Sequence, residues 1–334
     1  MDRTEEDMKL VGFFGMFNQS FKTIFSWKKI FAQVTLAFIL PLAIIYFVQQ
    51  EISSRYFWRI ENNSLPYDRN YSREATAMEW LYYLLFTIAY FIIFTVFAVP
   101  ATAAVVFTIA SIYTGREVSF RNAIKVIPKV WKRLFITFVC IYIAQLIYEV
   151  IVSIVMAICK AIFGFSLFSF VLMVIILILF VLGFLYLSVV YQLASVVTVL
   201  ENIHGFKALK KGKDLASGKK AVGMGIAFVL YGFLEGLIFV YWLFIKYGHV
   251  FFRLALIWRV MIGILCGILL LMLFLVFMVT QTVLYLVCKS YHREAIDKLS
   301  LSTFLEAYMG ETVVYPGSGE EIQLGHPQPP SEQV

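Results

Sequence analysis

Six long apolar stretches constrain this chain more than any other feature of its sequence. A helix needs about 20 residues to cross a hydrocarbon core about 30 Å thick. The chain is 61% hydrophobic and 15% charged, whereas soluble domains average about 45–50% apolar and about 25% charged residues. The sequence therefore predicts an all-α, polytopic transmembrane helix bundle of about six spans. These are Ile30–Val48, Leu81–Tyr113, Leu134–Ile158, Phe168–Leu200, Ala221–Ile245 and Val260–Cys288.

The even-numbered stretches are longer than one crossing requires. Their excess length must tilt, kink or project from the bilayer. Pro41 and Pro100 are the expected kink sites, because proline removes a backbone donor and crowds the preceding turn.

Lysine and arginine are divided unequally between the two sides that six crossings define. The N-terminus to Lys29, segments 115–133 and 202–220, and the tail from Lys289 hold twenty of them, and the other side holds eight. The positive-inside rule places the richer side in the cytoplasm. Both termini are therefore expected to be cytoplasmic, and the loop 49–80 to be lumenal or extracellular.

Two glycosylation sequons, at Asn62 and Asn70, lie in this loop, as a lumenal location allows. A third sequon, at Asn18, lies on the predicted cytoplasmic side, so these motifs add little to the topology. The N-terminus lacks a short apolar core with a cleavage site, and the first span is expected to be the targeting signal.

The domain organisation follows from these boundaries. Residues 1–29 form a cytoplasmic N-terminus, and residues 30–288 form the six-span membrane domain. Residues 289–309 have helical periodicity and predict a cytoplasmic surface helix. Residues 310–334 are short of large apolar residues and carry Gly, Pro and Glu, which predicts a disordered tail.

Three basic segments precede spans 1, 3 and 5 and share a pattern of aromatic and basic residues. We interpret each as a short amphipathic helix in the headgroup layer, with a transmembrane hairpin after it. Ordinary basic loops are the alternative. The segments run from Ser20-Phe21-Lys22 to Trp27-Lys28-Lys29, from Ser119-Phe120-Arg121 to Trp131-Lys132-Arg133, and from Gly205-Phe206-Lys207 to Lys219-Lys220. The expected lipid-surface contacts are Lys22, Lys28, Lys29, Arg121, Lys125, Lys129, Lys132, Arg133, Lys207, Lys210, Lys211, Lys213, Lys219 and Lys220.

One motif at the end of the fourth span resembles a known superfamily. It reads Tyr191-Gln192-Leu193-Ala194, Val199-Leu200-Glu201, Gly205, Ala208-Leu209, Leu215 and Gly218-Lys219. This resembles bacterial and plant six-span proteins that include the membrane domain attached to some glycerophosphodiester phosphodiesterases. The start, Ser20-Phe21-Lys22-Thr23-Ile24-Phe25-Ser26-Trp27-Lys28-Lys29-Ile30-Phe31 with Leu40-Pro41-Leu42, is similar to a plant family of uncharacterised multi-pass proteins in that group.

This resemblance extends to about Leu299 and implies an architecture rather than an activity. The phosphodiesterase chemistry belongs to a separate soluble domain with histidine and acidic metal ligands. The four histidines of this chain are scattered and have no such partners, so no activity is carried over.

Two glutamates inside apolar spans are the candidate functional residues, since ionisable groups in a membrane usually mark a pathway or a site. Gln145, Glu149 and Ser153 recur at helical spacing on one stripe, and Tyr231 and Glu235 do so on another. We expect the two carboxyl groups to face each other across spans 3 and 5. They would form a proton- or cation-coupled pathway or a polar headgroup site, or else hydrogen bonds between helices that carry no function.

Small and polar residues in the spans predict helix packing. Gly232 with Gly236, and Gly263 with Gly267, form two G-x-x-x-G motifs that would bring spans 5 and 6 together, or alternatively two copies of the chain. Polar residues near the basic ends of spans 4 and 6 are interpreted as interhelical hydrogen bonds rather than a pore lining: Gln192, Ser195, Thr198, Thr280, Gln281 and Thr282.

The sequence contains no nucleophile–base pair, metal-spaced cluster, phosphate loop or haem motif, so neither an enzyme nor a cofactor is expected. The basic residues border apolar segments, which favours anionic lipid headgroups over nucleic acid as partner. The sequence thus predicts a non-enzymatic multi-pass protein of the endoplasmic reticulum or plasma membrane that organises or contacts lipid. The alternative is a transporter or channel for a small solute, ion or lipid using Glu149 and Glu235, which requires a polar cavity or broken helices at the membrane midplane.

Overall fold

The computed structural model describes residues 12–63, 69–116, 118–164, 166–248, 253 and 255–292, and every regular element in these ranges is a helix. The expected tail at 310–334 and most of the expected surface helix at 289–309 lie outside them, as do the side chains of both loop sequons. The all-helical class predicted from the sequence is confirmed for the described residues.

Six helices are long and apolar enough to cross a membrane, and each contains one of the six predicted stretches. The first span comprises α3 (Lys28–Val34), the π-helical turn η1 (Thr35–Ile39) and α4 (Leu40–Asn63). The others are α5 (Arg69–Thr114), α6 (Phe120–Phe163), α7 (Leu167–Leu200), α9 (Lys220–Val240) with the π-helical turn η2 (Tyr241–Lys246), and α11 (Leu256–Tyr291).

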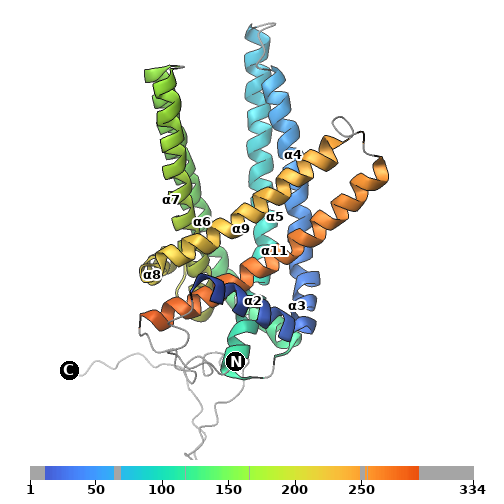
Figure 1. Ribbon diagram of the computed structural model, residues 1–334, viewed down its shortest axis with the longest axis vertical. Coiled ribbons are helices and arrows are strands. Elements are labelled where there is room, and N and C mark those ends of the chain that lie inside the picture. The colour runs from blue at the N-terminus through green and yellow to red at the C-terminus, as the bar shows by residue number, and fades with distance from the viewer. Residues whose placement is uncertain are drawn as a thin grey trace, which may run out of the picture.

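The spans form three antiparallel pairs, α4–α5, α6–α7 and α9–α11, because only short connections join the partners. Figure 1 shows that the pairs come together at one end of the molecule and spread apart at the other. We call the first the basic end, where α3, α6 and α9 begin and α5, α7 and α11 finish. The opposite end, at the three connections between paired helices, is the far end.

The buried core lies toward the basic end. It occupies the final parts of three spans, roughly residues 98–113 of α5, 185–200 of α7 and 275–290 of α11. The earlier parts of α7 and α11, and α6 beyond residue 143, expose large aliphatic side chains. Because no packed protein covers those parts, lipid is the solvent that an apolar surface of this kind requires.

Separate helices occur at two of the three basic segments, although the first is displaced from its predicted bounds, since Lys28 and Lys29 belong to α3. The two helices are α2 (Phe13–Ser26), which packs on α11 and α9, and α8 (Phe206–Ala216), which packs on α7 and α6. The second segment differs from the expectation, since Phe120 to Arg133 forms the first turns of the continuous helix α6. Neither Pro128 nor any other residue of that segment ends the helix before the span begins.

Helix α8 crosses α7 so closely that Gly212 of α8 lies against the backbone of α7. A Cβ atom on Gly212 would stand 2.8 Å from the carbonyl oxygen of Val190 and 3.0 Å from the amide nitrogen of Ala194. Only a residue without a side chain allows this approach. At the start of α8, the hydroxyl of Thr137 accepts a 2.9 Å bond from the Gly205 amide, and its oxygen lies 3.0 Å from the Thr198 hydroxyl.

Helix α2 is held against the bundle by a similar contact, in which the Thr280 hydroxyl donates to Ser20 Oγ at 3.2 Å. Its buried residues, Met16, Ser20, Thr23 and Ile24, face the protein, whereas Phe14 and Phe25 are exposed. The buried face of this amphipathic helix therefore packs on the protein core, and its other face forms part of the outer surface.

The first span contains a π-helical turn beside Pro41, whereas the kinks expected at Pro41 and Pro100 stay predictions. The π-helical turn η1 ends directly before Leu40-Pro41. Because Pro41 has no amide hydrogen, it cannot donate to the carbonyl of Ala37, and a wider turn accommodates the missing bond. Pro100 lies inside the continuous helix α5.

Candidate binding cavity

A cavity of about 340 Å³ lies at the centre of the bundle, where the three pairs come together. Residues of α4, α5, α6, α7, α9 and α11 line it, so all six spans contribute. Its volume falls within the range of about 300–1,000 Å³ typical of small-molecule sites.

The floor of the cavity, on the side of the basic end, is polar. Thr102 of α5, Gln192 and Ser195 of α7, and Gln281 of α11 lie there, and all four side chains are buried. These three helices run toward the basic end, so their polar residues meet at one level. Of the six polar residues noted in spans 4 and 6, Thr198 and Thr280 bond to other helices, and Thr282 donates to a carbonyl of its own helix. The other three, Gln192, Ser195 and Gln281, line the cavity.

Aromatic side chains form most of the walls. Rings of the lining pack edge to face, with centroids 5.7 Å apart for Tyr46 and Phe274 and 5.7 Å apart for Tyr231 and Phe277. Such contacts between rings hold their faces in fixed orientations. The eight aromatic residues of the lining are Tyr46, Tyr90, Phe94, Phe138, Tyr191, Tyr231, Phe274 and Phe277.

Two polar atoms of the lining are buried without a hydrogen-bond partner. They are the hydroxyl of Tyr191 and the amide nitrogen Nε2 of the next residue, Gln192, which is only 6% exposed. Leaving a buried polar group unpaired costs about 1–3 kcal/mol. Native structures rarely leave such groups without a partner. Two adjacent groups of this kind on a cavity lining therefore indicate that a ligand or water completes their hydrogen bonds.

Polar residues continue from the walls toward the far end. On α6, Phe138 and Ile141 line the cavity, and Gln145 and Glu149 follow on the same helical stripe. On α9, Glu235 follows one turn after the lining residue Tyr231. These helices run away from the basic end, so both carboxylates lie beyond the walls on the far-end side.

Electrostatic contacts support this placement of the glutamates. The Glu149 carboxyl group lies within electrostatic reach of Tyr191 and Tyr142, and the Glu235 carboxyl group lies within reach of Tyr46. Two of these three tyrosines, Tyr191 and Tyr46, line the cavity. Each acidic group thus lies near one wall of the cavity, and we call the surroundings of Gln145, Glu149 and Glu235 the mouth.

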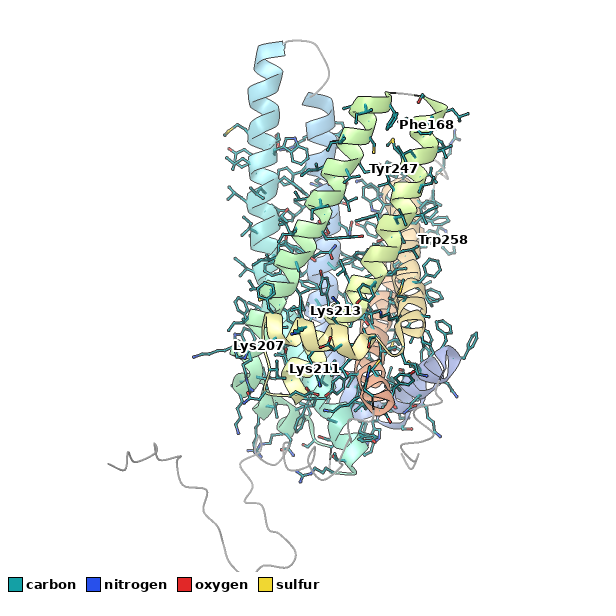
Figure 2. All side chains as sticks on the ribbon, turned by 90° about the vertical axis from the view of Figure 1, so that its left-hand side faces the viewer. Phe168, Lys207, Lys211, Lys213, Tyr247 and Trp258 are labelled. Carbon is teal, nitrogen blue, oxygen red and sulfur yellow. The ribbon has the colours of Figure 1, made fainter. Side chains whose placement is uncertain are left out.

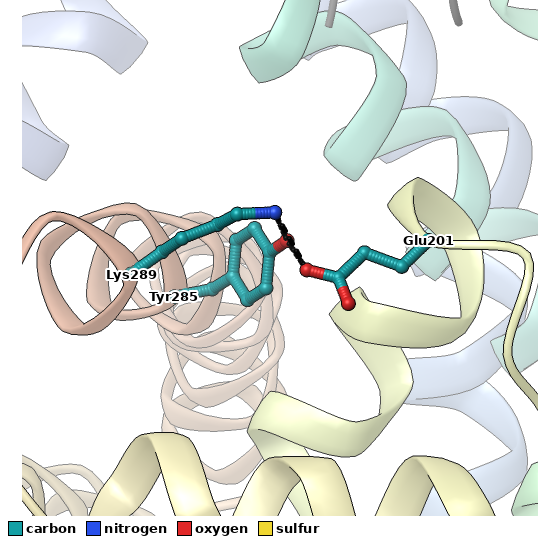
Figure 3. A network of polar contacts seen from close by, with 3 residues as sticks. All are labelled: Glu201, Tyr285 and Lys289. Atoms are coloured by element: carbon teal, nitrogen blue, oxygen red, sulfur yellow. Dashed lines mark hydrogen bonds and ion pairs between the residues drawn. The ribbon is translucent and has the colours of Figure 1, made fainter. Parts of the chain in front are cut away.

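On the opposite side, a three-residue network closes the basic end (Figure 3). Glu201 Oε1, just past α7, accepts a 2.6 Å bond from the Tyr285 hydroxyl and a 2.7 Å bond from Lys289 Nζ, both on α11. Burial opposes ionisation of Glu201. The bonds from Lys289 and Tyr285 and the charges of Lys289 and Lys211 outweigh burial and hold the pKa of this carboxyl below its ordinary value. We call these three residues the clamp.

The two candidate glutamates do not form the shared buried site that the sequence suggested. Both side chains are exposed, and α6 and α9 each pack on α7. Glu149 instead accepts a 2.9 Å bond from Gln145 on its own helix, and Ser153 donates to the Glu149 carbonyl at 2.8 Å. The expectation fails because the helix pairs diverge toward the far end (Figure 1), which separates residues of equal depth.

The glycine motifs also occupy open surface. A Cβ added at Gly232, Gly236 or Gly267 would meet no atom within 4 Å, and at Gly263 it would meet only Ile245 Cδ1 at 3.5 Å. Helices α9 and α11 therefore do not approach each other through these positions within one chain. A contact between copies, the alternative use of the motifs, stays a prediction.

The fourteen basic residues expected at the lipid surface gather at the basic end. Figure 2 shows Lys207, Lys211 and Lys213 on α8 in the lower part of the molecule, Phe168 near the top, and Tyr247 and Trp258 at heights between them. Arg133, Lys211 and Lys219 are half-buried, and the other eleven are exposed. Arg133 donates to the side-chain oxygen of Asn202, and Lys219 lies 5.6 Å from the centre of the Tyr291 ring.

Sequence reasoning included Tyr231 among the site residues and missed the floor and most of the walls. One signal for them existed, because Tyr191 and Gln192 belong to the motif that carries the family resemblance. The aromatic walls had no comparable signal, since tyrosine and phenylalanine are abundant throughout the chain.

Fold and site together define a class: a polytopic helical membrane protein with a ligand-sized cavity inside its six-span bundle. Within that class, the family model described as "Domain of unknown function (DUF8558)" matches residues 1–327, and the chain belongs to this family. No curated protein and no solved structure matches the chain.

Proposed function

We propose that this protein is a non-enzymatic membrane protein that binds an amphipathic molecule, a membrane lipid included, in its central cavity. The observation that carries the proposal is the unpaired Tyr191 hydroxyl beside the unpaired Gln192 amide, both on the lining of a largely aromatic cavity. Such a cavity offers apolar and π surface to the body of a ligand and a few hydrogen bonds that orient it.

The orientation of the protein in its membrane is part of this proposal. The basic end faces the cytoplasm of the endoplasmic reticulum or plasma membrane, because twenty of the 28 basic residues lie on that side. Exposed lysines of α8 and α6 then meet anionic headgroups. The resemblance to the six-span plant family favours a membrane module without catalysis.

Lipid that remains bound to the purified protein tests the proposal. Ala98 lines the cavity, whereas Ile93 on the same helix is an exposed, lipid-facing residue. We expect Ala98→Phe to remove a lipid that the unmodified protein retains in native mass spectra, because the ring occupies the cavity. Ile93→Phe is the matched control and should retain it. Equal retention in both variants would contradict a cavity site.

A second candidate, transport of the bound molecule, is favoured by the asymmetry of the cavity. Its mouth carries exposed glutamates, whereas the clamp and the packed core close the side of the basic end. The π-helical turns η1 and η2 interrupt two lining spans, and such turns are frequent at functional sites. Breaking the clamp with Lys289→Met should then raise uptake of the bound molecule into proteoliposomes, and unchanged uptake would count against transport.

A further inference from the structure

Aromatic rings line much of the central cavity, and two glutamates lie beyond its walls on the far-end side. Eight of its twenty lining residues are aromatic, and no Lys, Arg, His, Asp or Glu is among the described residues that line it. Glu149 and Glu235 flank the mouth at the ends of two lining stripes. The faces of aromatic rings are negative and attract cations, and quaternary ammonium groups are typically held in cages of such rings.

Two basic residues that follow Glu235 in the chain, Lys246 and Arg259, are engaged elsewhere. Lys246 donates to Ser54 and stands 3.9 Å from the centre of the Trp242 ring. Arg259 donates two bonds, of 2.9 and 2.6 Å, to the carbonyl of Ile245. Lys246 belongs to η2 and Arg259 to the start of α11, and neither of them lines the cavity.

The floor adds a second requirement. Gln192 Nε2 is a donor only, and it is buried without an acceptor. The neighbouring Tyr191 hydroxyl is unpaired as well. A ligand that completes these bonds must present an oxygen acceptor close to its apolar or cationic part.

We infer that the cavity recognises an organic cation of the quaternary ammonium class, which also carries a hydroxyl or phosphate oxygen. This inference rests on the proposed function and specifies the ligand of the same cavity. The aromatic walls hold the ammonium group, Glu149 and Glu235 attract it at the mouth, and Gln192 and Tyr191 bind the oxygen. A free choline-type cation and the headgroup of a choline lipid share this chemistry.

A matched pair of probes isolates the contribution of the positive charge. Choline and 3,3-dimethylbutanol have nearly the same shape and the same hydroxyl, but only choline is charged. We expect choline to bind the full-length protein in detergent at least about tenfold more tightly than the alcohol, a ratio that equals about 1.4 kcal/mol. Isothermal titration calorimetry measures both dissociation constants.

Variants then connect the charge preference to the mouth. Glu149→Gln combined with Glu235→Gln should lower the affinity for choline about tenfold and leave that for the alcohol unchanged. Asp214→Asn, on the exposed surface of α8, removes a carboxylate away from the cavity and is the control. For the lipid source, nanodiscs containing equal amounts of phosphatidylcholine and phosphatidylglycerol with identical chains show by mass spectrometry which lipid is retained.

The outcomes distinguish this inference from the function on which it rests. Equal affinity for choline and the alcohol, both abolished by Ala98→Phe, would overturn the cation specificity and leave a cavity that binds amphiphiles. If Ala98→Phe changes neither ligand binding nor lipid retention, both proposals fall. A preference for choline that is lost in the double glutamine variant supports the inference. Retention of phosphatidylcholine then indicates the lipid, and binding of choline alone indicates the free cation.

Discussion

At the scale of single residues, polar groups determine what each end of the cavity can do. Gln281, Tyr285 and Lys289 recur every four residues on one face of α11, so this face runs from the floor to the clamp. Glu201 from α7 completes the clamp, with its side chain 17% exposed. One carboxylate thus ties together the ends of two spans directly beneath the candidate site.

Removing the charge of Glu201 should destabilise the protein in a pH-dependent way. Hydrogen bonds to charged groups contribute about 1.5–3 kcal/mol, so Glu201→Gln should lower the free energy of unfolding by about that amount near pH 7. The folded-state pKa lies below the ordinary value of 4.5, so the contribution is present above 4.5. It is lost as the pH falls through the folded-state pKa.

Thermal unfolding in detergent between pH 7 and pH 3 measures this difference. The unfolding temperatures of the two proteins should converge as the pH falls. Tyr285→Phe is a useful control because it removes one neutral donor and keeps the ion pair, so its smaller deficit should depend less on pH. A deficit for Glu201→Gln that stays constant over the whole range would contradict the assigned pKa direction.

The unpaired amide of Gln192 predicts a separation of stability from binding. Replacing a buried, unpaired polar group by an apolar one of similar size is nearly neutral or stabilising. Gln192→Leu should therefore keep or raise the unfolding temperature of the ligand-free protein while weakening ligand binding. Thr198→Val, which removes a paired hydroxyl on the same helix, should instead lower stability by about 1 kcal/mol. A large stability loss in Gln192→Leu would show that the amide has a structural partner.

At the scale of elements, the basic segments act as packed helices and not only as surface anchors. Helix α8 contacts the backbone of α7 through Gly212, and α2 contacts α11 through Ser20. Both cover the part of the bundle where the core is buried. The basic residues of α2 and α8 therefore lie at the edge of a helix–helix contact, and that contact determines their positions.

Gly212→Val should disturb the contact between α8 and α7. The valine side chain cannot fit 2.8 Å from a carbonyl oxygen, and overpacking of this kind costs about 1–3 kcal/mol. We expect faster hydrogen exchange at the amides of α8, with the far end of α7 unaffected. Gly232→Val, at a position with open space, is the matched control. Equal exchange in wild type and Gly212→Val would mean that the close approach is absent.

The exposed lysines of α8 should matter for lipid and not for folding. Each basic residue near an anionic surface contributes about 1 kcal/mol. Replacing Lys207, Lys210 and Lys213 by Gln should therefore reduce the enrichment of phosphatidylserine around the full-length protein in mixed nanodiscs. The unfolding temperature should stay within about 2 °C, because surface substitutions change stability by about 0.5 kcal/mol or less. Unchanged phosphatidylserine enrichment would remove the support for a lipid-facing role of α8.

At the scale of the whole molecule, three helix pairs that converge at one end create the cavity where they meet. The convergence buries the ends of α5, α7 and α11, and the divergence leaves Glu149 and Glu235 on exposed surfaces. The convergence of the helix pairs at one end and their divergence at the other thus determine the positions of the core, the floor and the mouth. The same property gives the molecule two chemically different ends.

The topology of the chain is testable at this scale. Six crossings place the 49–80 loop on the side opposite both termini, and the distribution of basic residues places the termini in the cytoplasm. Cysteines introduced at Ser64 and Ser318 should therefore react with an impermeant maleimide from opposite sides of sealed membranes, once the four native cysteines are replaced. Labelling of both from one side would disprove the five crossings that the six-span topology places between them.

Much of the architecture could be predicted because it follows from local sequence. Apolar stretches of sufficient length predicted all six spans, and aromatic–basic patterns predicted α8 and the second half of α2. The second basic segment was mispredicted as a separate helix, since nothing local distinguishes a surface helix from the first turns of a long span. The glutamate pair was mispredicted because depth in the membrane was known and the angles between helices were not.

The sequence by itself determined that this chain spans a membrane by helices, since hydrocarbon accepts only backbones whose hydrogen bonds are satisfied internally, and length and composition reveal such segments. Only the tertiary structure decided which polar residues meet. Gln192, Ser195, Gln281 and Thr102 come from three helices far apart in the chain, and their common level depends on how those helices cross. Crossing angles arise from side-chain packing between helices, and no local pattern records them.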